Sequence, residues 1–251
     1  MIGIDLGSRS VKIVQMDYKT ITRCELYDTI GFYRRYASAE KGVLSLDLTR
    51  LGFVEQRVVA TGYGKVTLQV AGADTIPEIQ AHVNGAVFQS GINDFTLLDI
   101  GGQDTKVIKV REGRAVDFMT NDRCAASSGR YLENMAAVLG LSLEELSACS
   151  EEPVELNTTC AIFGETEIIA RIVEGHSLKS LAAGVNYSLY RRFAAMLKQM
   201  DSETIILSGG CALNTGLQRI IAQETGVPVL SLPEPQLNGA IGCCVWGLSH
   251  L

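Results

Sequence analysis

The sequence contains two copies of one short pattern of acidic, glycine and basic residues. Residues 4–14 and 98–108 align without a gap, and each copy has an aspartate, a glycine two positions later and a lysine seven positions after the aspartate. A carboxylate at the end of a strand can hold a hydrated magnesium ion, and the N–H groups of a glycine turn converge on phosphate oxygens. Two such turns that face each other predict a polyphosphate that is bound from both sides.

A third glycine turn lies in residues 204–214, where a predicted strand runs into Ser-Gly-Gly and then a helix. Because glycine has no side chain, a flat base or a ribose can approach such a turn closely. The two common nucleotide loops do not fit. Residues 61–66 lack the first glycine of a P-loop and have Val66 in place of its Ser or Thr, and Thr67 stands where a dinucleotide-binding loop needs its third glycine. The order of the three turns resembles the acetate kinase, sugar kinase, heat-shock-70 and actin superfamily of ATP-binding folds.

We therefore predict that ATP or ADP and Mg²⁺ bind at the three turns. The Mg²⁺ shell is assigned to Asp5 and Asp99. The assignments for the nucleotide are Gly7, Ser8, Lys12, Gly101 and Gly102 for the phosphates, and Gly209, Gly210 and Asn214 for the adenosine.

Hydrolysis of ATP needs a side chain that orients the attacking water. Gln103 and Asp104 follow the second phosphate turn directly, and Glu78, at the start of a predicted helix, is a rival for this role. Glu167 is assigned to the ribose, with a merely solvated glutamate on a helix surface as the alternative.

Two cysteines stand at the starts of predicted helices. Cys124 precedes the helix at 127–139 and Cys160 precedes the helix at 161–174. The free N–H groups and the partial positive charge of a helix N-terminus favour the thiolate form of cysteine. Two thiolates are half of the ligand set of a [4Fe–4S] cluster, and a two-fold axis would supply the other half. The alternatives are two buried apolar cysteines, a disulfide, or structural zinc without the usual C-x-x-C spacing.

The composition excludes several classes of protein. A net charge of −6 and a pI near 5.2 do not favour nucleic acid as a partner. The longest uncharged apolar run, residues 239–248, is shorter than the roughly 20 residues of a membrane span. Seven cysteines without a charged-apolar leader lead us to expect the reducing cytoplasm. The five cysteines away from the cluster are expected to be packing or incidental residues: Cys24, Cys149, Cys211, Cys243 and Cys244.

Periodicity predicts an α/β protein in which strands and helices alternate. The repeat predicts two related lobes, one formed by residues 1–92 plus 237–251 and the other by 93–236, which carries the cluster cysteines and the adenosine turn. Strands are predicted at 2–6, 10–17, 21–30, 56–61, 95–100, 104–111 and 204–208. Helices are predicted at 34–50, 77–90, 127–139, 161–174, 178–200, 213–225 and 239–248.

Nearly the whole chain resembles the activator family of 2-hydroxyacyl-CoA dehydratases, which includes the ATP-hydrolysing subunits of benzoyl-CoA reductases. The segments that carry the resemblance are GIDLGS at 3–8, TGYG at 61–64, DIGGQDTK at 99–106, NDRCAA at 121–126, TC at 159–160 and GAIG at 239–242. The resemblance implies two duplicated actin/heat-shock-70-like (ribonuclease H-like) lobes around an ATP cleft. It also implies a cytoplasmic homodimer, from an anaerobe, with one oxygen-sensitive [4Fe–4S] cluster held by Cys124 and Cys160 of each subunit.

In such a family, ferredoxin or flavodoxin reduces the cluster, and ATP hydrolysis drives a low-potential electron into a partner iron–sulfur enzyme. This chain departs from the usual pattern after each cysteine, with Ser127-Ser128-Gly129 in place of Gly-Thr-Gly and with Gly164 and Thr166 where Ala and Ser are more common. The alternatives that stay open are a reductase of a double-cubane-cluster protein, a small-molecule kinase of the same superfamily, and a non-catalytic sensor dimer of iron, oxygen or nucleotide.

Overall fold

The computed structural model describes residues 1–40, 43–46, 48–53, 57–62, 70, 72–121, 128–157 and 163–251. Both predicted cluster ligands, Cys124 and Cys160, lie outside the described residues. The chain forms two compact units. Unit 1 consists of Met1–Asn93, Val110–Ala115 and Leu232–Leu251, and unit 2 consists of Asp94–Lys109 and Val116–Ser231.

Unit 1 is built on a five-stranded sheet with the strand order β3-β2-β1-β6-β7. The pairs β1–β2 and β2–β3 are antiparallel, and the pairs β1–β6 and β6–β7 are parallel. The strands are β1 (Ile2–Leu6), β2 (Ser10–Asp17), β3 (Thr20–Asp28), β6 (Val58–Thr61) and β7 (Ala73–Thr75); β4 (Ala37–Glu40) and β5 (Val43–Leu46) form a separate hairpin.

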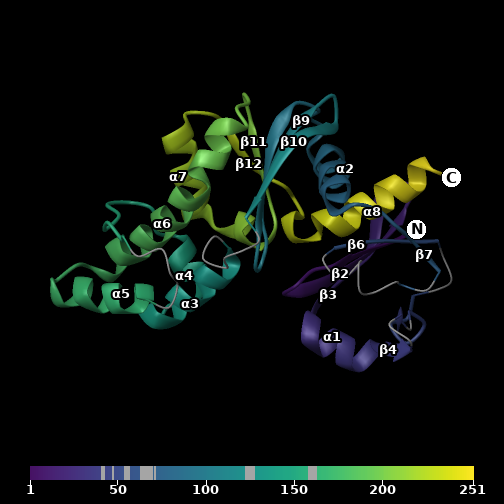
Figure 1. Cartoon of the computed structure of the whole chain (residues 1–251), viewed down its shortest axis with the longest axis horizontal. Coiled ribbons are helices and arrows are strands. Elements are labelled where there is room, and N and C mark those ends of the chain that lie inside the picture. Colours follow the sequence, from purple (N-terminus) through teal and green to yellow (C-terminus); the bar gives the residue numbers. More distant parts are fainter. Residues whose placement is uncertain are drawn as a thin grey trace. The chain divides into compact units, whose positions relative to one another are not determined.

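Helices cover both faces of this sheet (Figure 1). On one face, Ile4 and Leu6 of β1 share a core cluster with Phe32 of α1 (Thr29–Tyr36). On the other face, α8 (Asn238–Ser249) packs against β1, β2 and β6 and along α2 (Glu78–Ser90). Because side chains alternate along a strand, β1 has residues on both faces of the sheet, and the helices bury them on each face.

Unit 2 repeats the strand order of unit 1, as β10-β9-β8-β11-β12. Its central pair, β8–β11, is parallel, like β1–β6 in unit 1. The strands are β8 (Phe95–Ile100), β9 (Thr105–Arg111), β10 (Arg114–Asn121), β11 (Ile205–Ser208) and β12 (Val229–Ser231). The helices are α3 (Gly129–Leu139), α4 (Leu143–Ser147), α5 (Phe163–Val173), α6 (Leu178–Gln199) and α7 (Thr215–Thr225), with a short 3₁₀ turn at η3 (Gly210–Leu213). A further 3₁₀ turn, η4 (Pro235–Leu237), belongs to unit 1.

The matching strand orders confirm the duplication that the sequence repeat predicts, because the repeated segments form β1–β2 in unit 1 and β8–β9 in unit 2. The predicted helix at 34–50 is wrong. The helix instead begins at Thr29, where the Asp28 carboxylate accepts a hydrogen bond from the Gly31 N–H, and it ends at Tyr36. The hairpin β4–β5 follows, so Val43–Leu46, which lies within the predicted helix, is a strand.

Strand β10 was not predicted, and its turn explains its position. Glu112 and Gly113 both have positive φ, 50° and 71°, which is the backbone of a tight two-residue hairpin. Among the described residues, no helix combines the length and the apolar character that a membrane span requires.

Three of the five other cysteines are buried, as predicted for packing residues: Cys211, Cys243 and Cys244. Burial raises the pKa of the Cys211 thiol to about 12, with a further contribution from Asp99. Burial also raises the pKa of Cys244 to about 12 and that of Cys243 well above its usual value. Cys24 instead lies exposed on β3, so it has no packing role.

We expect iodoacetamide at pH 8 to modify Cys24 in the native protein and to spare Cys211. A thiol with a pKa near 12 is ionised in only about one molecule in 10⁴ at that pH, and burial blocks the reagent as well. Peptide mass spectrometry of native and urea-unfolded samples measures this difference. Labelling of Cys211 at the rate of Cys24 in the native state would contradict the burial of its thiol.

Candidate functional site

The first of the two repeated aspartate–lysine pairs, Asp5 and Lys12, forms across two antiparallel strands. Asp5 and Lys12 are direct partners in the β1–β2 register, which explains their separation of seven positions. Asp5 is 3 % exposed, and its Oδ2 accepts a hydrogen bond of 3.1 Å from Lys12 Nζ. The other oxygen, Oδ1, is buried without a hydrogen-bond partner in the described part of the chain. A buried carboxylate oxygen without a partner costs free energy and therefore suits a cation or its bound water.

The turn after Asp5 requires glycine at position 7. A Cβ on Gly7 would lie 2.7 Å from the Ser10 carbonyl oxygen and 2.8 Å from Lys12 Nζ. Thr29 Oγ1 donates a hydrogen bond of 2.8 Å to the Gly7 carbonyl and so fixes the turn from outside. Ser8 lies half-buried in the same turn. The Lys12 ammonium group therefore lies beside the bare backbone of Gly7.

Close contacts of His82 and Gly239 connect Glu78 to the Asp5 carboxylate. A Cβ on Gly239 would be 3.1 Å from both Asp5 Oδ2 and His82 Nε2, so Gly239 separates the two side chains by the width of one backbone. Glu78 Oε1 is 3.9 Å from His82 Nε2. Unit 1 thus brings together Asp5, Lys12, His82 and Glu78.

In unit 2, a second buried aspartate and lysine lie at the end of β8. Lys106 Nζ is 3.8 Å from Asp99 Oδ2 and forms a closer ion pair with Asp104 Oδ2. Asp99 is 3 % exposed and Lys106 is 5 % exposed. The Lys106 ammonium group therefore lies between the carboxylates of Asp99 and Asp104 at this turn.

The third turn lies beside the second because β11 pairs with β8 in parallel, with Ser208 opposite Asp99. Gly209 has φ of +80°, and a Cβ there would be 2.4 Å from the Ile100 carbonyl oxygen and 3.0 Å from Asp99 Oδ1. Only glycine allows this approach. Gly209 therefore borders the carboxylate of Asp99, and Gly210 follows it at the start of η3.

The model of the BadF/BadG/BcrA/BcrD ATPase family matches residues 2–247. The chain belongs to this ATPase family. It is 34 % identical over 254 residues to the (R)-2-hydroxyglutaryl-CoA dehydratase activating ATPase of Acidaminococcus fermentans, covering 98 % of this chain and 95 % of the relative. It is 33 % identical over 200 residues to the 2-hydroxyisocaproyl-CoA dehydratase activator of Clostridioides difficile, covering 78 % of this chain and 74 % of the relative.

Among solved structures, the ATPase is similar to the activator of the 2-hydroxyisocaproyl-CoA dehydratase from Clostridium difficile with bound ADPNP. The TM-score is 0.84 at 28 % identity, over 100 % of this chain and 94 % of that one. The similarity confirms the fold class that the sequence predicts. It also supports ATP binding by this ATPase, because the neighbour holds an ATP analogue.

The side chain of Gln103 is exposed, and it makes no hydrogen bond within the described residues. Asp104 is already engaged, because its carboxylate binds Lys106. Of the two residues predicted to orient the attacking water of the ATPase, Gln103 is therefore the one with an uncommitted side chain.

Two residues predicted to contact the nucleoside have structural partners. Asn214 is 5 % exposed; its Oδ1 accepts a hydrogen bond from the Leu217 N–H and caps α7, and its Nδ2 donates to Asn186 Oδ1. Glu167 Oε1 accepts a hydrogen bond of 2.8 Å from the Asn157 N–H. The side chains of Asn214 and Glu167 therefore hold the backbone in place, in addition to any contact with a nucleoside. Their partners Asn186 and Asn157 could not be identified from local sequence.

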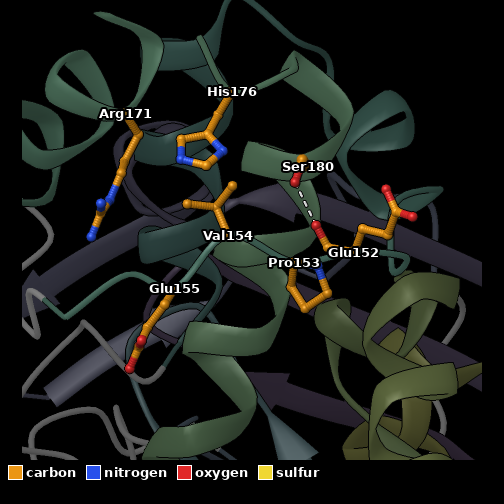
Figure 2. Close-up of a pocket in the computed structure, with 7 residues that line it drawn as sticks. All are labelled: Glu152, Pro153, Val154, Glu155, Arg171, His176 and Ser180. Atoms are coloured by element: carbon orange, nitrogen blue, oxygen red, sulfur yellow. Dashed lines mark hydrogen bonds between the residues drawn. The ribbon is translucent and has the colours of Figure 1, made fainter. Parts of the chain in front are cut away.

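A surface hollow of about 440 Å³ lies elsewhere in unit 2, lined by Glu152, Pro153, Val154, Glu155, Arg171, His176 and Ser180 (Figure 2). Ser180 Oγ donates a hydrogen bond to the Glu152 carbonyl oxygen, and Arg171 pairs with Glu174. Of the predicted site residues that the structure describes, none lines this hollow.

We expect Asp5→Asn to weaken Mg²⁺-dependent ATP binding about 10- to 100-fold. The substitution removes the charge that Lys12 contacts and that a bound cation would contact, and hydrogen bonds to charged groups contribute about 1.5–3 kcal/mol. Calorimetric titration with ATP, with and without Mg²⁺, measures the effect. The control is Asp74→Asn, which removes an exposed aspartate of unit 1 paired with Arg57. Equal affinity of Asp5→Asn and wild type in Mg²⁺ would contradict the assignment.

Proposed function

We propose that this ATPase couples ATP hydrolysis to the transfer of a low-potential electron to a partner iron–sulfur enzyme, a 2-hydroxyacyl-CoA dehydratase or a reductase of the benzoyl-CoA type. The electron donor is a ferredoxin or flavodoxin, and the protein acts as a homodimer in the cytoplasm of an anaerobe. The observation that carries the proposal is the 34 % identity to a dehydratase activating ATPase over 98 % of the chain.

The residues of the turns have different roles in the binding and hydrolysis of ATP. Asp5 and Asp99 would hold Mg²⁺, which would neutralise phosphate charge when bound. The Oδ1 atom of Asp5, which has no hydrogen-bond partner among the described residues, fits that role. Lys12 binds phosphate oxygens from the first turn. The backbone N–H groups of Gly101 and Gly102 bind them from the second. Gln103 orients the attacking water, and Gly209 leaves room for the adenosine.

We assign the cluster to Cys124 and Cys160 of each subunit. Four thiolates are the usual ligands of a [4Fe–4S] cluster, which supplies one-electron redox chemistry when bound. The described neighbours support a common site, because the helices that follow the two cysteines contact each other: a Cβ on Gly164 of α5 would be 3.4 Å from Met135 Cε of α3. Glu167 of α5 also accepts a hydrogen bond from the N–H of Asn157, which stands three residues before Cys160 in the sequence.

The experiment uses anoxically purified protein reduced by dithionite, mixed with the dehydratase that the Acidaminococcus fermentans relative activates. We expect dehydration of (R)-2-hydroxyglutaryl-CoA with ATP and at least about 10-fold less with ADPNP, since hydrolysis drives the transfer. The relative itself serves as the positive control. Equal rates with ATP and ADPNP would contradict a hydrolysis-driven step. ATP hydrolysis without any dehydration would contradict the assignment of a dehydratase partner.

A further inference from the structure

Three hydrogen bonds connect the second phosphate turn, at Gly101 and Gly102, to the beginning of helix α3. The Gly129 N–H donates to the Gly101 carbonyl oxygen at 2.9 Å, and the Arg130 N–H donates to the Gly102 carbonyl oxygen at 3.1 Å. Ser128 Oγ also donates to the Gly102 carbonyl oxygen, at 3.0 Å. All of these residues belong to unit 2. The first N–H groups of a helix commonly bind an anion, but here two of them bind the turn itself.

We propose that Ser128 is a positioning residue that transmits the state of the bound nucleotide from the Gly101–Gly102 turn to the start of α3, and thereby to the chain that carries Cys124. This inference rests on the proposed function for the role of Cys124. Its structural part, a nucleotide-dependent link between the turn and α3, stands on the contacts of Ser128.

The geometry of the peptide bond makes the link directional. In a planar trans peptide, the C=O and the N–H point to opposite sides. The Gly101 carbonyl faces α3, so the N–H of the same peptide unit, that of Gly102, points away from α3. The Gly102 carbonyl likewise faces Ser128, and the Gln103 N–H of that unit points away. A phosphate that binds these N–H groups fixes the peptide planes, and the glycines permit the planes to rotate when the phosphate leaves.

The hydroxyl of Ser128 does not make the hydrogen bond that is usual at its position in a helix. Ser128 stands at the N-cap position of α3, where a serine oxygen usually accepts a hydrogen bond from an N–H of the first helical turn. Here the side chain makes no capping bond and contacts the phosphate turn instead. Ser128 is also completely buried, so water does not replace that contact. A serine that stabilised only the helix would cap it.

Helix α3 itself is firmly held in unit 2. Gly129 lies close to the turn, since a Cβ there would be 3.2 Å from the Gly101 carbonyl oxygen. Tyr131 is 2 % exposed, and the Arg192 guanidinium of α6 lies 3.7 Å from the centre of its ring. A rearrangement of the turn is therefore not absorbed by the body of the helix. Cys124 stands four positions before Ser128 in the sequence.

The test compares Ser128→Ala with Ser128→Thr, which keeps the hydroxyl. Hydrogen exchange of the peptide that covers residues 128–135 is measured in the anoxically purified protein with ADP and with ADPNP. We expect wild type and Ser128→Thr to show about a 5-fold difference in exchange between the two nucleotides, the factor that one hydrogen bond is worth. In Ser128→Ala the difference falls to less than about 2-fold, while ADPNP affinity stays within about 3-fold.

Ser180→Ala is the matched control, because Ser180 also donates its hydroxyl to a backbone carbonyl of unit 2, in the surface hollow (Figure 2). This variant is expected to keep the full nucleotide difference. A full difference in Ser128→Ala would overturn the proposal, as would its absence from wild type. Loss of the difference in both Ser128→Ala and Ser128→Thr would also overturn it, because the hydroxyl would then not be the linking group. Failure of the dehydratase assay alone would contradict the proposed function and leave this exchange result intact.

Discussion

Gln103→Ala is expected to slow ATP hydrolysis about 100-fold and to leave ATP affinity within about 3-fold, since a residue that orients the reacting water contributes on the order of 10²–10⁴ in rate. The reason is the environment of Gln103, whose exposed side chain follows the second phosphate turn and makes no hydrogen bond within the described residues. Single-turnover phosphate release measures the chemical step, and titration with ADPNP measures binding.

The rival for this role is Glu78, which lies 3.9 Å from His82 in unit 1. Glu78→Gln preserves the size of the side chain and removes its charge. We expect less than about a 5-fold loss of hydrolysis rate from this variant. A large loss in Glu78→Gln together with normal turnover in Gln103→Ala would assign the water to Glu78 and contradict our choice.

Gly242→Ala is expected to lower the free energy of unfolding by about 3 kcal/mol or more, the upper end of what overpacking costs. A Cβ at this position would be 1.7 Å from the Ala81 carbonyl oxygen and 2.6 Å from its carbon. Both contacts are to the backbone of α2, so no side-chain rotation can relieve them, and α8 must move away from α2. Thermal unfolding followed by circular dichroism should show a decrease in Tm of about 6 °C or more for a chain of this size.

Gly31→Ala is the matched control for Gly242→Ala. Gly31 lies in helix α1 of the same unit, and a Cβ there would meet only Asp28 Oδ2 at 3.4 Å, an ordinary contact. Because alanine favours the helix more than glycine does, we expect no loss of stability. If Gly242→Ala unfolded at the wild-type temperature, the close packing of α8 on α2 would be wrong.

The hairpin that holds Asp5 and Lys12 could be predicted from the sequence because it depends on local spacing. A separation of seven positions becomes a cross-strand pair when two strands are joined by a tight turn, and Asp5 and Lys12 are such a pair. The segment GAIG at 239–242 also has a physical meaning that the sequence did not reveal. Gly239 adjoins the Asp5 carboxylate, and Gly242 allows the contact between α8 and α2, so the motif serves both the site and the packing.

Residues whose role depends on distant partners could not be predicted in the same way. Asn214 bonds to Asn186 on α6, and Glu167 bonds to the backbone of Asn157, although a position near the nucleoside was predicted for both. Ser128 looked like a departure from a family pattern, and only the fold places its hydroxyl on the Gly102 carbonyl. The predicted helix at 34–50 failed for a local reason, because Asp28 caps a helix that begins earlier and Val43–Leu46 pairs as a strand with Ala37–Glu40.

The central claim is that this ATPase carries one iron–sulfur cluster per dimer between Cys124 and Cys160 of both subunits. Iron and acid-labile sulfide, measured per dimer in protein purified without oxygen, test it most directly. We predict about four irons and about four sulfides per dimer, lost in Cys124→Ser and in Cys160→Ser and retained in Cys24→Ser, whose thiol is exposed on β3. A colourless, iron-free wild-type protein that still hydrolyses ATP would contradict the account.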